Sequence, residues 1–254
     1  ETLAFPEIST YTASNKDFGV YLCEKIIARI EKSHTRTPGF SEGFKIDNTA
    51  TIGIPFNLNS LKITVVGSIN MDTYLNVPQL PHTGKTVITS TSSVYPGGKG
   101  INQAIGASRL GHRVTLIGNV GSDLDSDNIY RALNENGVET HGVKRCLQTD
   151  TGKAYIFVDS NGDSMISILT GANGIFTPQD ICEKEHLFEN TGYCLIQSEI
   201  PLDTMREACR MAHKYHAKTI VKPSACSSMT REMLADIDII IPNEDELFEL
   251  CSKY

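Results

Sequence analysis

A glycine-rich stretch carries the strongest chemical signal in this sequence. It reads Tyr95-Pro-Gly-Gly-Lys-Gly-Ile-Asn-Gln-Ala104, with three glycines around Lys99. Ile101, Ala104 and Ile105 recur at helical spacing, which predicts a bare backbone turn that leads into a helix N-terminus. The unpaired N–H groups of a first helical turn favour hydroxyl or anionic oxygen, so the stretch predicts a site for a small polar ligand.

Several polar residues are spaced to meet at this turn. Lys99 and Asn102 lie three positions apart and face one side of the helix start, while Asn70 and Asp72 are spaced as neighbours on one face of a strand end. A sugar pocket needs carboxylates that only accept, amides that do both, and a donor such as an ammonium or a backbone N–H. That mixture is supplied by Asn70, Asp72, the Gly98 amide, Lys99, Asn102 and Glu199.

Three of these residues also have a purely structural explanation. Asn70 and Asp72 are suited to capping the turn that follows the first strand, and Glu199 to an exposed loop before Pro201. The functional interpretation depends on their joint occurrence.

Four motifs in order resemble the signatures of the ribokinase family of carbohydrate kinases. They are Gly67-Ser-Ile-Asn-Met-Asp72, Gly97-Gly-Lys-Gly-Ile-Asn-Gln-Ala104, Ser198-Glu199 and Pro242-Asn-Glu-Asp-Glu246. The resemblance runs from about Leu61 to Tyr254. It implies a ribokinase-like α/β fold, in which a mostly parallel sheet is flanked by helices in a three-layer, Rossmann-like arrangement and carries a small β lid.

The resemblance also implies an activity and its site. It implies transfer of the ATP γ-phosphoryl group to a sugar hydroxyl, with D-ribose as the leading acceptor and ribose 5-phosphate as the product. The family's sugar contacts match Asn70, Asp72, Gly98, Lys99, Asn102 and Glu199 in this sequence.

A second group of residues resembles the family's nucleotide site. Asn243 and Glu246 look like the motif that organises Mg²⁺ and phosphate, although acids in a first helical turn also simply complement the helix dipole. Lys222 stands where ribokinases commonly carry an asparagine beside the phosphates, so either the lysine contacts phosphate or the phosphate subsite is altered. We assign Lys222 to nucleotide binding. Glu246 is assigned to the metal.

The family's catalytic aspartate lies in a Gly-Ala-Gly-Asp signature that this sequence does not contain. The resemblance places that aspartate, the anion hole and the K⁺ site beyond Tyr254, so no catalytic residue is assigned and this fragment is expected to be inactive. A different class of function remains open, namely a sugar-sensing module that lacks phosphotransfer and serves a fused transcriptional regulator.

The elements that must position these residues follow a βα alternation from Lys62 onward. Short apolar strands are predicted at 63–66, 114–117, 193–196, 219–221 and 237–241, with helices between them, which indicates a mostly parallel sheet covered on both faces. Segments 86–94 and 154–169 break this alternation, and Asn161-Gly162 marks a hairpin turn in the second. By resemblance these strands form a lid over the sugar, paired with the lid of a second subunit in a homodimer.

The first 60 residues do not follow the kinase pattern. Phe18, Leu22, Ile26 and Ile30 recur every fourth residue, which predicts one amphipathic helix. Residues 1–33 resemble the closing strand and helix of the effector-binding domain of LacI-type repressors, and residues 34–60 are typical of a linker. The chain is therefore expected to be part of a repressor–kinase fusion cut at both ends, with 61–254 as the N-terminal two-thirds of a kinase domain.

Composition narrows the possible partners. The chain has 254 residues, a net charge of −7 and a sequence pI near 5.5, so a broad basic surface for nucleic acid is not expected and DNA binding would need a missing repressor domain. Seven scattered cysteines without a Cys-x-x-Cys pair are typical of reduced thiols in a cytoplasmic protein. No apolar run reaches the length of a membrane span.

Overall fold

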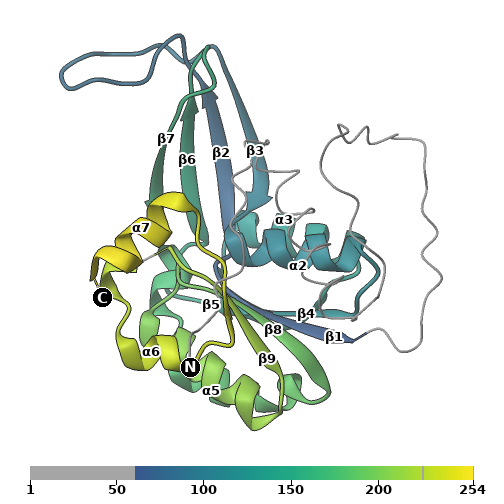
Figure 1. The fold of residues 1–254 in the computed structure, drawn as a ribbon. Coiled ribbons are helices and arrows are strands. Elements are labelled where there is room, and N and C mark those ends of the chain that lie inside the picture. The colour runs from purple at the N-terminus through teal and green to yellow at the C-terminus, as the bar shows by residue number, and fades with distance from the viewer. Residues whose placement is uncertain (1–60, 225, 254) are drawn as a thin grey trace, which may run out of the picture. The chain divides into compact units, whose positions relative to one another are not determined.

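A six-stranded parallel sheet forms the centre of the fold in a computed structural model that describes residues 61–224 and 226–253 (Figure 1). Its strands lie in the order β10-β9-β8-β1-β4-β5, and every pairing is parallel. Every residue of β4 is buried, as expected for a strand covered on both faces. The strands are β1 Lys62–Val66, β4 Val114–Gly121, β5 Glu139–Cys146, β8 Thr191–Gln197, β9 Lys218–Lys222 and β10 Ile239–Ile240.

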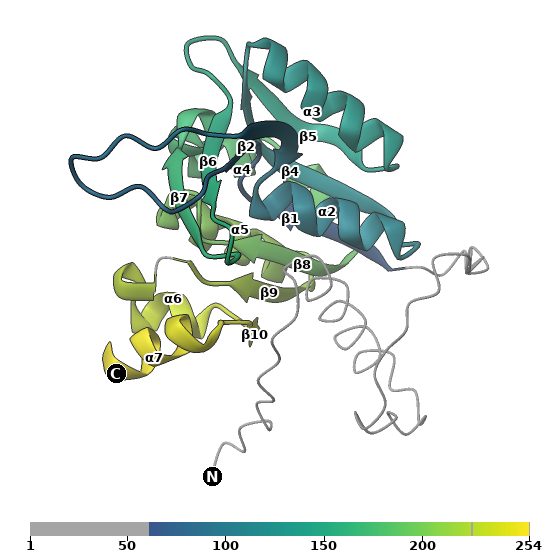
Figure 2. The same cartoon turned by 90° about the horizontal axis from the view of Figure 1, so that it is seen from above.

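Helices cover both faces of this sheet. Two of them, α2 (Lys99–Arg109) and α3 (Leu124–Glu135), lie on one face, and α5 (Leu202–Lys214) lies on the other (Figures 1 and 2). The buried residues of α5 recur at helical spacing and pack in the main apolar core with Phe176 and Phe188. The shorter helices are α4 Pro178–Cys182, α6 Arg231–Ala235 and α7 Glu244–Lys253, and the 3₁₀ turns are η1 Gly171–Ile175, η2 Glu185–Phe188 and η3 Cys226–Ser228.

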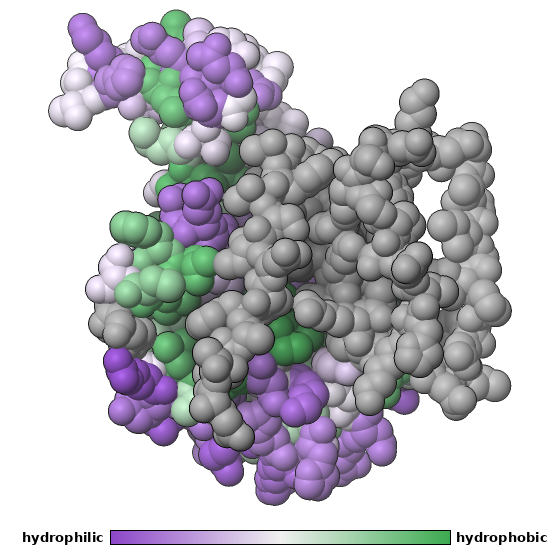
Figure 3. Space-filling model, viewed as in Figure 1, coloured by the Kyte–Doolittle hydropathy of each residue, from purple (hydrophilic) through white to green (hydrophobic). Residues whose placement is uncertain are grey.

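A second, four-stranded sheet projects from the first and forms the lid (Figure 1). Its order is β3-β2-β6-β7, with β2 parallel to β6 and the two outer pairings antiparallel. Apolar residues reach the surface along the lid, interspersed with hydrophilic ones (Figure 3). The lid strands are β2 Asn70–Asn76, β3 Thr91–Gly97, β6 Gly152–Val158 and β7 Ser164–Leu169.

The structure confirms the α/β alternation and corrects the boundaries of the lid. The lid strand expected at 86–94 runs instead from Thr91 to Gly97, into the glycine-rich turn itself. Asn70 and Asp72 lie on one face of the inner lid strand β2, as their spacing predicted, and do not cap a turn, because seven consecutive residues of β2 pair with β3 and with β6. Asparagine and aspartate are depleted in strands, so local propensity concealed β2.

Other boundaries differ in smaller ways. Strand β5 was not expected, and β10 covers only Ile239–Ile240 of the predicted 237–241. The hairpin turn at Gly162 is confirmed, with a φ of 87° at that residue. The predictions for 1–33 and 34–60 fall outside the described residues. Within the described part of the chain, no helix is long and apolar enough to cross a membrane.

Candidate active site

The glycine-rich turn connects lid strand β3 to helix α2 and lies at the base of the lid. Gly98 is the N-cap of α2 and has a φ of 94°, a conformation that L side chains rarely adopt. A Cβ on Gly97 would clash with the Asp72 carboxylate, which occupies the space above the bare Cα. The glycines are therefore needed for a left-handed turn and for close approach of Asp72.

Lys99 and Glu199, which are 100 residues apart in sequence, form an ion pair next to this turn. Ser68 joins them, because its Oγ donates to Glu199 Oε2 at 2.9 Å and accepts from the Lys99 backbone N–H at 3.2 Å. The Lys99 side chain is 40% exposed and that of Glu199 is 18% exposed, so both are accessible to a ligand. The structure thus links the carboxyl ends of β1 and β8 to the N-terminus of α2.

Asp72 presents a carboxylate oxygen that has no partner among the described residues. Its Oδ1 is buried without a hydrogen bond. Burial raises the pKa of Asp72 above its ordinary value, against the opposing effect of the Gly98 backbone N–H; nearby Glu199 raises it further and Lys99 lowers it. A buried acceptor without a donor is a candidate contact for a ligand hydroxyl.

Asn70 lies deeper and is held by a residue that sequence reasoning missed. Asn173 Nδ2 donates to Asn70 Oδ1 at 2.8 Å and to the Ile69 carbonyl at 3.0 Å, and its Oδ1 accepts from the Ile69 N–H at 2.9 Å. Asn70 and Asn173 are both almost fully buried. Asn173 therefore fixes the start of β2, and no local pattern marked it, because it lies 103 residues from Asn70.

We expect Asn173→Ala to lower the free energy of unfolding of the full-length protein by about 2–4 kcal/mol, because it leaves buried backbone and amide groups unpaired. Urea unfolding followed by circular dichroism measures this change. Asn128→Ala, at an exposed position of α3, is the matched control and should stay within about 0.5 kcal/mol of wild type. Equal losses in the two variants would contradict the role given to Asn173.

Among the residues predicted to bind the sugar, Asn102 has the weakest support from the structure. Its backbone N–H donates to the Gly98 carbonyl at 3.1 Å in the first turn of α2, and its side chain is exposed. It lies one helical turn beyond Lys99, on the same side of the helix. The structure therefore brings together Asp72, Gly98, Lys99 and Glu199, and leaves Asn102 at the margin.

The three residues predicted for nucleotide and metal also meet. Lys222 at the end of β9 forms an ion pair with Glu246 in α7. Asn243 and Glu246 cap the start of α7 reciprocally: the Asn243 N–H donates to Glu246 Oε2 at 2.7 Å and the Glu246 N–H donates to Asn243 Oδ1 at 2.8 Å. Asn243 and Glu246 thus have a structural role at the helix N-terminus, while Asn243 is exposed and Glu246 is partly exposed.

Both clusters lie at the carboxyl ends of the strands of the parallel sheet. Ser68 follows β1, Glu199 follows β8, Lys222 ends β9 and Asn243 follows β10, and these four strands are consecutive in the sheet. Ligands of open α/β sheets bind outside the carboxyl ends of the strands. The order of the strands places the sugar candidates and the phosphate candidates side by side.

These residues could hold Mg²⁺ only if water and the phosphate groups of a ligand supplied the other metal ligands. Among the described residues, no group of three or more His, Cys, Asp or Glu could hold a metal ion. Mg²⁺ commonly keeps several waters and uses one or two carboxylates together with substrate phosphates. Glu246 suits such a role as a single carboxylate.

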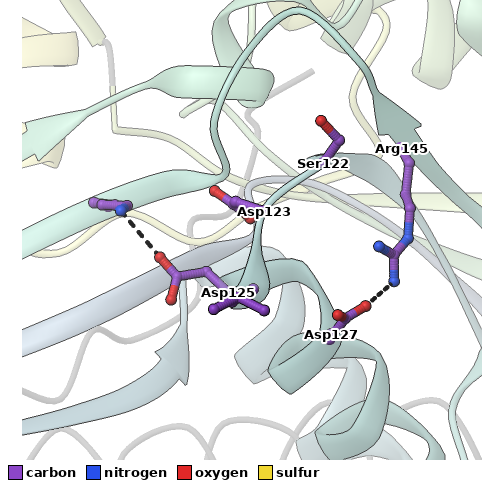
Figure 4. Close-up of a pocket in the computed structure, with 7 residues that line it drawn as sticks. Ser122, Asp123, Asp125, Asp127 and Arg145 are labelled. Carbon is purple, nitrogen blue, oxygen red and sulfur yellow. Dashed lines mark hydrogen bonds and ion pairs between the residues drawn. The ribbon is translucent and has the colours of Figure 1, made fainter.

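A separate pocket lies at the start of α3 and carries several charges (Figure 4). Arg145 pairs with Asp127, and Lys153 pairs with Asp125 at 3.0 Å. Lys153 is opposite Met71 in the β2–β6 register, so it lies on the lid face that does not carry Asp72. Asp123, which also lines the pocket, hydrogen-bonds to Thr151 and Ser126. Because its charged side chains are engaged in this way and Lys153 lies on the other lid face, we do not assign this pocket to the site.

Comparisons with known proteins identify the family of the chain. The model of the pfkB family of carbohydrate kinases matches residues 60–254. The ribokinase of Bacillus subtilis is 34% identical over 184 residues, which cover 72% of this chain and 62% of that protein. The bifunctional ribokinase/ribose-5-phosphate isomerase A of Fructilactobacillus sanfranciscensis is 37% identical over 186 residues, 73% of this chain and 34% of that protein.

Solved structures show the same fold. The structure of Arabidopsis thaliana ribokinase complexed with ribose and ATP has a TM-score of 0.69 and 30% identity, and the match covers 76% of this chain and 63% of that one. The chain thus spans less than two-thirds of the length of each of these relatives. Its fold is ribokinase-like, and the chain belongs to the pfkB family of carbohydrate kinases.

Proposed function

We propose that the full-length protein transfers the γ-phosphoryl group of ATP to a hydroxyl of D-ribose and forms ribose 5-phosphate. The observation that carries this proposal is the cluster at the base of the lid, where Lys99, Glu199 and Ser68 are bonded together beside the unpartnered Asp72 oxygen. The cluster offers both hydrogen-bond acceptors and hydrogen-bond donors, which the hydroxyl groups of a polyol require. Relatives named ribokinase, and one complexed with ribose and ATP, support the choice of substrate.

The sugar-binding role is proposed for Asn70, Asp72, Gly98, Lys99, Asn102 and Glu199. Asp72 and Glu199 would accept hydrogen bonds from the sugar hydroxyls, Lys99 and the Gly98 amide would donate hydrogen bonds to them, and Asn70 would hold the start of β2 in place. The lid above them would exclude water, which limits hydrolysis of the nucleotide. Fixing the hydroxyl against the phosphate supplies much of the rate in this chemistry.

The nucleotide-binding role is proposed for Lys222 and Asn243, with Glu246 at Mg²⁺. Lys222 is a cation at the carboxyl end of β9, next to β10 and α7, where a phosphate would be attracted. The aspartate that takes the hydroxyl proton, the anion hole and a K⁺ site are proposed to lie in the part of the relatives that this chain does not span. On this proposal, residues 1–254 alone do not catalyse transfer.

Two further parts of the proposal concern assembly. Residues 1–33 are proposed to be the end of a LacI-type effector-binding domain joined by a linker at 34–60 to the kinase domain at 61–254. A homodimer through the lid strands is supported by β7, an edge strand of the lid on which Met165, Ile166, Ile168 and Leu169 are all exposed.

The choice of ribose is tested with the full-length protein, saturating ATP and Mg²⁺, and a panel of pentoses and hexoses. Mass spectrometry should detect a phosphopentose from ribose at the lowest sugar concentrations, and phosphorus NMR should place the phosphate on the 5-hydroxyl. Product from another sugar, with none from ribose, would overturn the choice of substrate and keep the kinase.

A further inference from the structure

We propose that Tyr74 and Tyr95 form an aromatic wall of the sugar site that packs against the C–H face of the acceptor. This inference rests on the proposed function and adds two specificity-determining residues to it. Neither tyrosine belongs to the polar cluster described above.

Strand register places both rings on the lid face that carries Asp72. Along β2, Asp72 and Tyr74 are two residues apart and therefore share a face. Across the β2–β3 pairing, Tyr95 is the direct partner of Asp72. The two rings meet edge to face, with centroids 6.2 Å apart and an interplanar angle of 63°.

The rings lie close to the unpartnered carboxylate. Burial raises the pKa of Tyr74 and the charge of Asp72 raises it further, which indicates that the phenol lies within electrostatic range of Asp72. Even so, 37% of Tyr74 and 57% of Tyr95 is exposed. Aromatic surface beside a buried acceptor without a donor is the arrangement of a pocket that binds a ligand with both hydroxyls and an apolar side.

A sugar has such a side. Its ring C–H groups carry a small positive charge, and the face of an aromatic ring carries a negative quadrupole, so the two attract each other. A hydrogen bond from a sugar hydroxyl to Asp72 would bring the C–H groups of the same sugar toward the two tyrosines. The wall would then discriminate between sugars by the shape of their apolar face, which the polar cluster cannot read.

A second copy of the chain is the competing explanation for exposed aromatic rings on a lid. Two of the exposed aliphatic residues that support lid pairing, Ile166 and Ile168, share the lid face of the tyrosines, because they pair with Ile156 and Ala154. They lie on β7, however, at the opposite edge of the lid from β3. The tyrosines lie on β2 and β3, beside Asp72. Their position therefore favours the sugar.

The test measures ribose affinity of the full-length protein by calorimetry for Tyr74→Leu and Tyr95→Leu. Each variant should bind ribose about 3- to 10-fold more weakly, and the phenylalanine variants should stay within about 2-fold of wild type. Tyr155→Leu is the matched control, because Tyr155 pairs with Thr73 and lies on the other lid face. Steady-state kinetics should show the loss in KM, with kcat largely kept.

The outcomes separate this inference from the proposed function. Asp72→Ala is measured in parallel, and unchanged ribose binding in that variant would refute the sugar site as a whole. Loss in Asp72→Ala with wild-type affinity in both leucine variants would refute the aromatic wall alone. A loss that appears only at protein concentrations where light scattering shows a leucine variant to have dissociated would assign the rings to a subunit interface and overturn the inference.

Discussion

Asp72→Ala is expected to weaken ribose binding by the full-length protein roughly 10- to 100-fold. The reason is that Oδ1 is a buried acceptor with no partner among the described residues, and a hydrogen bond from a sugar hydroxyl would satisfy it. Hydrogen bonds to a charged group contribute more than neutral ones. Calorimetric titration of ribose measures the loss, and Asp163→Ala at the exposed tip of the lid should bind as wild type does.

The raised pKa of Asp72 also predicts that sugar binding depends on pH. Its pKa is raised, chiefly by burial, so the free protein loses the ionised acceptor at a higher pH than an ordinary aspartate would. Ribose affinity should therefore fall as the pH drops toward that pKa. Asp72→Asn should bind more weakly and remove this fall, whereas an identical fall in the asparagine variant would assign the pH dependence to another group.

Lys222→Gln is expected to weaken ATP binding roughly 10-fold while adenosine binding stays near the wild-type value. The glutamine keeps most of the length of the side chain and removes its charge, so only a contact that depends on phosphate should be lost. Lys222 pairs with Glu246 in this structure, and a phosphate would compete for the same ammonium group. Calorimetric titration of the full-length protein with each ligand measures the difference.

Lys218→Gln provides the matched control for Lys222. Lys218 begins the same strand, β9, and is paired with Asp238 at the amino ends of the strands. Its loss should leave both affinities unchanged. If Lys222→Gln weakened adenosine as much as ATP, the lysine would act through the position of α7, and its proposed phosphate contact would be wrong.

The parallel sheet was predictable because its strands are short apolar runs that alternate with helical periodicity. Such runs include Val65 and Val66 of β1 and Leu195 and Ile196 of β8, which are buried in the structure. The extent of strand β2 was not predictable in the same way, because the spacing of Asn70 and Asp72 indicates only a strand end and these residue types are depleted in strands. Its pairing with β3 and β6 is set by partners that are distant in the sequence.

The candidate site was likewise only partly predictable from the sequence. Motif spacing predicted Asp72, Lys99 and Glu199, because the chemistry of sugar binding limits which side chains can serve. Ser68 lies inside the motif Gly67-Ser-Ile-Asn-Met-Asp72, yet its hydrogen bond to Glu199 spans 131 residues and is set by the fold. Asn173 had no local signal at all, since its role is to satisfy buried groups at the start of β2.

Release of ADP by the full-length protein, with Mg²⁺, K⁺ and ribose, tests the central claim most directly. Glu199→Ala serves as the control, because it removes the partner of Lys99 and of Ser68. We expect ADP release that depends on the sugar and falls sharply in the control. If the protein bound ribose but released ADP with none of the pentoses and hexoses tested, the proposed kinase activity would be contradicted. The sugar site would then be identified as that of a sensor.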